Sequence, residues 1–224
     1  MKIMRSAVVF LGLILLSAPV IHGQDLSKYR NFSFGMSVAD LSKQVDLSPL
    51  QTKRIDNRPA VIEELTWWPR NSSGSSLLAD SVWQVFFTFY HGELYRILVT
   101  YDRDATKGLT AEDMVQAISA QYGIATRPDA QIGFPTNELY RSTEKVIARW
   151  EDSQYSINLF RSRSLNSFGL VMFAKRLDGQ AEAAIAESAK LEGQEDLRKE
   201  IERKEREAGD LEVAREQNRK AFRP

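Results

Sequence analysis

The sequence predicts an α+β fold, with helices and antiparallel strands in one chain, from three observations. Segments that alternate polar and apolar residues recur through the body of the chain, as strands with one buried face do. The helix entry at residues 35–41 has a weak copy at residues 108–114, at an offset of 73 residues. The last part of the chain is rich in charge and almost free of aromatic residues. We therefore expect three parts, which are residues 1–23, 24–177 and 178–224.

Composition limits the classes of function. The 224 residues are 43% apolar and 27% charged, which fits one medium or two small domains with a tail. Lys and Arg number 30 against 30 Asp and Glu, so the chain lacks the basic excess with which nucleic-acid-binding proteins neutralise phosphates. The chain has no cysteine, which excludes disulfides, thiolate metal sites and a cysteine nucleophile.

Residues 1–23 have the layout of a secretory signal. Lys2 and Arg5 precede an apolar run at 7–16, and a region of small residues follows at 17–23. The run is shorter than the roughly 20 residues that a spanning helix needs. We expect cleavage near Gly23, an exported protein in the periplasm or outside the cell, and no stable membrane span after cleavage.

Both copies of the helix entry carry capping residues. Ser37 and Thr110 can each accept a hydrogen bond from an unpaired backbone N–H at the start of a helix. Asp40 and Asp113 follow three residues later, where a carboxylate can return the bond or complement the helix dipole. Gly123 is a natural end for the second helix.

Strand segments follow each helix. They lie at 60–68, 82–90 and 93–101 in the first half, and at 145–150, 154–161 and 168–175 in the second. The pair 82–90 and 93–101 predicts a hairpin through His91-Gly92. One face of each strand of the hairpin is apolar and should enter the core, and the opposite face should be open. The apolar face carries Trp83, Val85, Phe87 and Phe89 in the first strand and Tyr95, Ile97, Val99 and Tyr101 in the second.

The simplest organisation is two tandem copies of a helix followed by three antiparallel strands. The copies span about 30–105 and 106–177, and they would form a sheet with the helices on one face. Consecutive antiparallel strands need only short turns, whereas a parallel sheet would need crossover helices that the sequence lacks.

This plan resembles the fold of β-lactamase inhibitory proteins and of small outer-membrane lipoproteins of the SmpA/OmlA type. The resemblance covers roughly residues 30–176 and rests on the Gly35-Met36-Ser37 and Gly108-Leu109-Thr110 entries and on element order. It implies a compact module that binds other proteins on a sheet surface. The lipid-attachment cysteine of the lipoproteins and the paired cysteines usual in such inhibitors are absent, so the resemblance carries over architecture but no binding residue.

The tail at 178–224 predicts a long charged helix. Of the 35 residues from 190 to 224, 20 are charged, and pairs such as Glu200 with Lys204 have the i,i+4 order that supports an exposed helix. Leu197, Ile201, Ala208 and Leu211 form a partial heptad seam that Lys204, Arg215 and Asn218 interrupt. A coiled coil and a solvated, partly frayed helix are the two alternatives.

One motif indicates an enzyme. Asp102-x-Asp104-x-Thr106 after an apolar strand looks like the first motif of haloacid-dehalogenase-type phosphatases, in which both aspartates would help to hold Mg²⁺. That family places its aspartates after parallel strands, whereas Asp102 here ends a hairpin arm, so a polar strand-to-helix turn is the competing interpretation. A calcium-binding loop from Asp102 to Asp113 is a further alternative. It does not match in detail, because Lys107 occupies the position at which the turn needs glycine.

The aromatic residues favour protein binding. Trp67 and Trp68 are adjacent in a strand and face opposite sides, so one of them should reach the surface. Phe86 and Tyr90 lie on the mixed face of the hairpin, and together these four are the candidate binding residues. We expect an exported, non-enzymatic module of the cell envelope or periplasm that binds another protein and needs no cofactor. The alternatives are a Mg²⁺-dependent phosphohydrolase and a spacer that self-associates through its tail.

Overall fold

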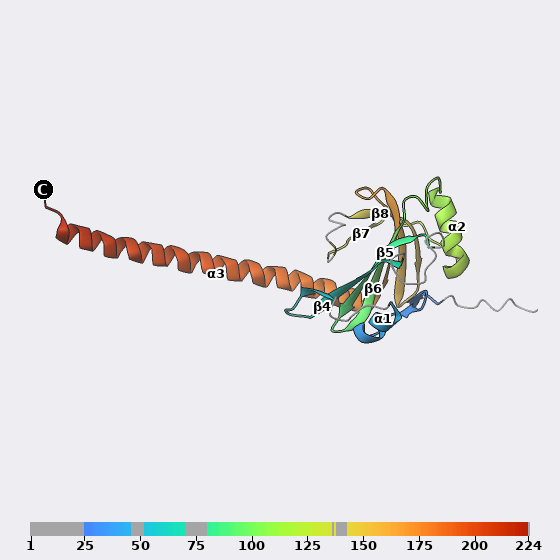
Figure 1. Ribbon diagram of the computed structural model, residues 1–224, viewed down its shortest axis with the longest axis horizontal. Coiled ribbons are helices and arrows are strands. Elements are labelled where there is room, and N and C mark those ends of the chain that lie inside the picture. Colours follow the sequence, from blue (N-terminus) through green and yellow to red (C-terminus); the bar gives the residue numbers. More distant parts are fainter. Residues whose placement is uncertain (1–24, 46–51, 70–79, 136, 138–142, 224) are drawn as a thin grey trace, which may run out of the picture.

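The protein is a mixed α+β structure with a long C-terminal helix (Figure 1). The computed structural model describes residues 25–45, 52–69, 80–135, 137 and 143–223, so the expected export signal at 1–23 lies outside the described residues. The described helices are α1 Val38–Gln44, α2 Ala111–Tyr122 and α3 Lys175–Ala221. The described strands are β1 Lys28–Tyr29, β2 Phe32–Ser33, β3 Lys53–Asp56, β4 Ile62–Trp67, β5 Val82–Tyr90, β6 Glu93–Tyr101, β7 Gln131–Ile132, β8 Glu144–Glu151, β9 Tyr155–Ser162 and β10 Ser167–Ala174.

The described strands form one large antiparallel sheet and one small one. The large sheet has eight strands in the order β3-β4-β5-β6-β10-β9-β8-β7, and β1 pairs with β2 beside it. Its centre is the β6-β10 pair, in which Leu98 lies opposite Val171. The expected hairpin is present as β5-β6, with His91 and Gly92 both at positive φ (51° and 84°), as a two-residue turn of type I′ requires.

The helix entries have the expected caps. Ser37 Oγ accepts from the backbone N–H of Asp40 at 3.1 Å, and Thr110 Oγ1 accepts from that of Asp113 at 3.2 Å. In α2 the Asp113 carboxylate also accepts from the Thr110 N–H at 2.8 Å, which completes a capping box. Local sequence therefore sets where both helices begin.

One face of the sheet packs on α1 and α2. Phe87 and Val99 from the hairpin share a core cluster with Leu41 of α1 and Ile118 of α2, and each of these four side chains is buried. Tyr29 and Phe32 of the small sheet close the same cluster.

The opposite face is also covered, which corrects the expectation of an open sheet. Phe86, Leu98 and Val171 pack there with Phe134 and Phe160, all buried. The start of α3 covers the rest, where Leu177 and Ala181 pack on Ile62 and Tyr95. The polar residues on this face suggested an open side, yet Thr88, Arg96 and Asn158 are 4% exposed or less. Arg96 bonds to Asp178 of α3 and to Gly133, and Asn158 Oδ1 accepts from Arg149 Nε at 2.6 Å.

Two β-bulges change which side chains enter the core. The β5-β6 register shifts between Val82 and Gln84, and Trp83 is 40% exposed instead of joining Val85 and Phe87. A second shift lies between Thr88 and Phe89. It places Tyr95 on the face covered by α3, with Leu177 and Ala181, and not on the face of Ile97. The expectation for both residues was wrong because a bulge adds one residue and reverses the alternation.

A buried ion pair fixes α3 to the centre of the sheet. Arg96 Nη1 lies 2.7 Å from Asp178 Oδ1, and its Nη2 donates to the Gly133 carbonyl at 2.6 Å. The guanidinium lies over the Phe173 ring, 5.4 Å from its centroid. Arg96 thus joins the first turn of α3, the segment after β7 and the central strand.

We expect this pair to make stability depend on pH. Burial raises the pKa of Asp178 to about 6 from its ordinary 3.8, although the charge of Arg96 opposes the rise. Between these two values the folded state binds more protons than the unfolded state, so the free energy of unfolding should fall as pH rises through this window. Urea titrations from pH 4 to 7 should show this fall in the wild type and a weaker one in Asp178→Asn. Equal pH profiles would contradict the assignment.

Candidate functional site

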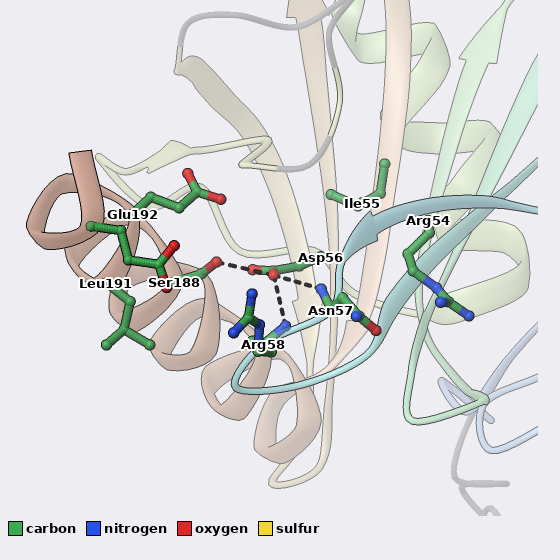
Figure 2. Close-up of a pocket in the computed structure, with 9 residues that line it drawn as sticks. Arg54, Ile55, Asp56, Asn57, Arg58, Ser188, Leu191 and Glu192 are labelled. Carbon is green, nitrogen blue, oxygen red and sulfur yellow. Dashed lines mark hydrogen bonds between the residues drawn. The ribbon is translucent and has the colours of Figure 1, made fainter. Parts of the chain in front are cut away.

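A cavity of about 310 Å³ lies where α3 leaves the sheet (Figure 2). We call it the arm-base pocket, and its lining comes from β3 with the following turn and from one face of α3. The lining residues are Arg54, Ile55, Asp56, Asn57, Arg58, Ser188, Leu191, Glu192 and Glu195. Its volume is at the lower limit of small-ligand sites.

Asp56 forms hydrogen bonds with both walls of the pocket. Its Oδ1 accepts from Ser188 Oγ at 3.0 Å and from the backbone N–H groups of Asn57 at 2.6 Å and Arg58 at 3.2 Å (Figure 2). Ser188 is 8% exposed, so water competes little for its hydroxyl. One carboxylate therefore shapes the turn after β3 and holds it to α3, 132 residues further along the chain.

The rest of the pocket offers charges of both signs. Arg54 lies 3.7 Å from Glu63, while Arg58, Glu192 and Glu195 form no ion pair in the part of the chain that the structure describes. Ile55 is half-buried, and Leu191 is 38% exposed. Such a lining can hold a polar group of either charge, but it does not pair a nucleophile with a base.

Sequence reasoning missed this pocket because its walls are distant in the sequence. A signal for one wall was available: Leu177, Ala181, Ala184, Ser188 and Leu191 alternate in steps of four and three, the spacing of one helix face. Nothing local indicates that this face meets the turn after β3.

The Asp102-x-Asp104-x-Thr106 motif forms the turn between β6 and α2. Asp102 Oδ1 accepts from the backbone N–H groups of Asp104 at 2.9 Å and Ala105 at 2.8 Å, and Thr106 Oγ1 donates to the Asp102 carbonyl at 2.8 Å. The strand before it, β6, has antiparallel neighbours on both sides. The contacts are those of a polar strand-to-helix turn.

The surroundings of this motif bear on the metal chemistry that it would need. Asp113, the last residue of the calcium-loop alternative, uses its carboxylate in the α2 capping box. Within the described residues, no group of three or more His, Cys, Asp or Glu side chains could hold a metal ion. Asp104 and Thr106 line a cavity of about 250 Å³ together with Arg103, Lys107 and Arg161, so cations outnumber carboxylates there.

The four aromatic candidates do not form one surface. Trp67 is half-buried against Phe32, with ring centroids 5.5 Å apart, whereas Trp68 is 40% exposed. Phe86 is 6% exposed because it packs with Phe134 and Phe160 on the sheet face opposite α1 and α2, so it offers no contact surface. Tyr90 is half-buried beside Tyr95, at 6.4 Å between centroids.

Trp83 joins Trp68 at the surface. Trp67 lies opposite Val85 in the antiparallel β4-β5 pair. Trp68 follows Trp67 and Trp83 precedes Val85 by two residues, so both lie at the same end of that pair. Each is 40% exposed. Sequence reasoning placed Trp83 in the core because the bulge at its position gives no local signal.

The largest exposed element is the second part of α3, which projects away from the sheet (Figure 1). Every residue from 189 to 223 is exposed, and we call residues 189–221 the arm. Ion pairs within the helix support it, including Glu200 with Lys204 at 2.9 Å and Arg203 with Glu207 at 2.8 Å. At about 1.5 Å per residue, the 47 residues of α3 extend about 70 Å.

Comparison with protein-family models, curated proteins and solved structures finds no match to this chain. The resemblance to the inhibitory proteins and the small lipoproteins stays a prediction from the helix entries and element order. Of the helices that the structure describes, none is both long and apolar enough to cross a membrane.

Proposed function

We propose that this chain is an exported, non-enzymatic protein-binding module of the cell envelope or periplasm, in which the arm carries the binding surface. The export part rests on Lys2, Arg5 and the apolar run at 7–16. The binding part rests on the arm, which keeps large apolar side chains where the described residues provide nothing to pack against them.

The observation that carries the proposal is the exposure of these apolar side chains. Leu197 is 60% exposed, Ile201 49% and Leu211 71%, all in a part of α3 that the other described elements leave uncovered. Helices in proteins owe most of their stability to packing an apolar face. A long helix that presents such residues to water gains stability when a partner covers them.

We also propose that the body consists of two related halves. The support is the order α1-β3-β4-β5-β6 followed by α2-β7-β8-β9-β10, with a capped helix entry at the start of each half. The halves would meet at the β6-β10 pair. In this plan α3 is an addition to the two halves. Its first turns cover the sheet face that the resemblance to the inhibitory proteins assigns to protein binding. The arm would then provide the binding surface in place of that face.

Photocrosslinking in the full chain tests the proposal. We expect a benzoylphenylalanine at Leu211 to give a discrete crosslinked protein in cells, because its neighbours within the chain leave it 71% exposed. The same probe at Trp68, 40% exposed on the body, shows whether the body binds instead. Crosslinks of the chain to itself would favour the self-associating spacer. No crosslinked protein at either position would overturn the proposal.

A further inference from the structure

The arm carries a partly apolar stripe on another side of α3 than the residues that pack on the body. Positions spaced by four and three residues run from Leu197 to Asn218, which is the spacing of a coiled-coil seam. We call them the distal stripe, and they are Leu197, Ile201, Lys204, Ala208, Leu211, Arg215 and Asn218.

The distal stripe lies on the side of α3 that is turned away from the body. Leu197 follows Ser188, which bonds to Asp56, by nine residues. At about 100° per residue, nine residues make about two and a half turns, so the two side chains point in opposite directions. A second helix can therefore lie along the stripe without meeting the sheet.

Glutamates flank both sides of the stripe over its middle part. Glu200 and Glu207 directly precede Ile201 and Ala208, and Glu205 and Glu212 directly follow Lys204 and Leu211. These are the positions from which charged side chains reach across to a partner helix. Glu200 and Glu207 already pair within the arm, whereas Glu205 and Glu212 form no ion pair among the described residues.

The flanking charges disfavour a second copy of this chain. In a parallel pair, Glu200 would face Glu205 of the other copy, and Glu207 would face Glu212. An antiparallel pair that places Glu205 opposite Glu212 of the other copy also places Arg198 opposite Arg219, so like charges face each other along that flank. Like charges in these places select against a partner, and Lys204 and Arg215 within the seam weaken a homotypic core further.

We infer that the distal stripe binds an amphipathic helix of another protein that carries Lys or Arg on both sides of its apolar face. The inference rests on the proposed function and specifies the partner. Basic flanks would pair with Glu205 and Glu212, while the apolar seam covers Leu197, Ile201 and Leu211. Acidic residues opposite Lys204 and Arg215 would set the register of the two helices.

The test uses the purified full chain and two labelled peptide probes of about four heptads each, with the same Leu and Ile seam. One probe carries Lys on both flanks, and the other carries Glu. By fluorescence anisotropy we expect the Lys probe to bind at least about tenfold more tightly, with a difference that shrinks at high salt. Equal binding of the two probes would overturn the inference.

Charge reversal provides the matched variants. Glu205→Lys with Glu212→Lys should weaken binding of the Lys probe at least about tenfold and improve that of the Glu probe. Glu202→Lys with Asp210→Lys changes the net charge equally but lies outside the flanks, and should change binding less than about threefold. Circular dichroism checks that both variants keep the helix. Equal losses in the two variants would overturn the inference.

The crosslinking probe at Leu211 separates this inference from the proposed function. A partner crosslinked by the wild type and lost in Glu205→Lys with Glu212→Lys supports both. A partner that both chains retain leaves the proposed function standing and overturns the basic-flanked helix, as does a crosslink to a second copy. A probe at Val213, which is 57% exposed but lies outside the stripe, should give a much weaker crosslink.

Discussion

Replacing Gly169 by alanine will destabilise the protein by about 3 kcal/mol. Gly169 lies opposite Phe160 in the β9-β10 pair, and a Cβ added there would be 2.3 Å from Phe160 Cζ and 2.8 Å from Cε1 and Cε2. Carbon atoms do not approach so closely, so the ring or the strand must move. Phe160 is fully buried and packs against Phe134 with centroids 5.0 Å apart, so the ring has no free space.

Urea unfolding monitored by tryptophan fluorescence measures this loss as a lower midpoint with an unchanged slope. Gly209→Ala is the matched control, because a Cβ at Gly209 would meet nothing within 4 Å and alanine favours an exposed helix. We expect it to raise the helix content slightly. Adding Phe160→Leu to Gly169→Ala should recover part of the loss. A Gly169→Ala protein as stable as the wild type would contradict the packing described for β9 and β10.

Replacing Asp178 by alanine should cost about 3 to 5 kcal/mol, because it leaves the guanidinium of Arg96 buried without its carboxylate. The two side chains are 4% and 8% exposed, and their nearest atoms are 2.7 Å apart. Glu182 lies 3.9 Å from Arg96 but is 58% exposed, so it offsets little of the loss. The first turn of α3 would also lose its polar contact with β6.

The arm provides a control pair of the same geometry in water. Arg203 and Glu207 are 2.8 Å apart with both side chains 59% exposed, so Glu207→Ala should cost less than about 1 kcal/mol. Replacing both buried partners, as in Arg96→Met with Asp178→Leu, should cost less than Asp178→Ala alone, because no unpaired charge remains. Similar losses for Asp178→Ala and Glu207→Ala would show that burial does not strengthen the pair.

Neighbouring residues along the chain decided several parts of the fold, and these were predictable. Ser37 and Thr110 begin helices because their hydroxyls cap the first turn, and His91-Gly92 makes a hairpin because both residues accept positive φ. The charged tail is helical, as the i,i+4 pairs indicate. Each of these signals acts between residues that are at most four positions apart in the sequence.

The tertiary structure decided which side chains are available for function. A bulge brings Trp83 to the surface, and the packing of Phe134 and Phe160 buries Phe86. The arm-base pocket brings Asp56 and Ser188 together across 132 residues, and the covered sheet face brings Arg96 and Asp178 together across 82. Alternation within a strand gives the two sides of that strand, but not what packs on either side. What packs on each side depends on contacts between distant segments, and a local pattern carries no information about those contacts.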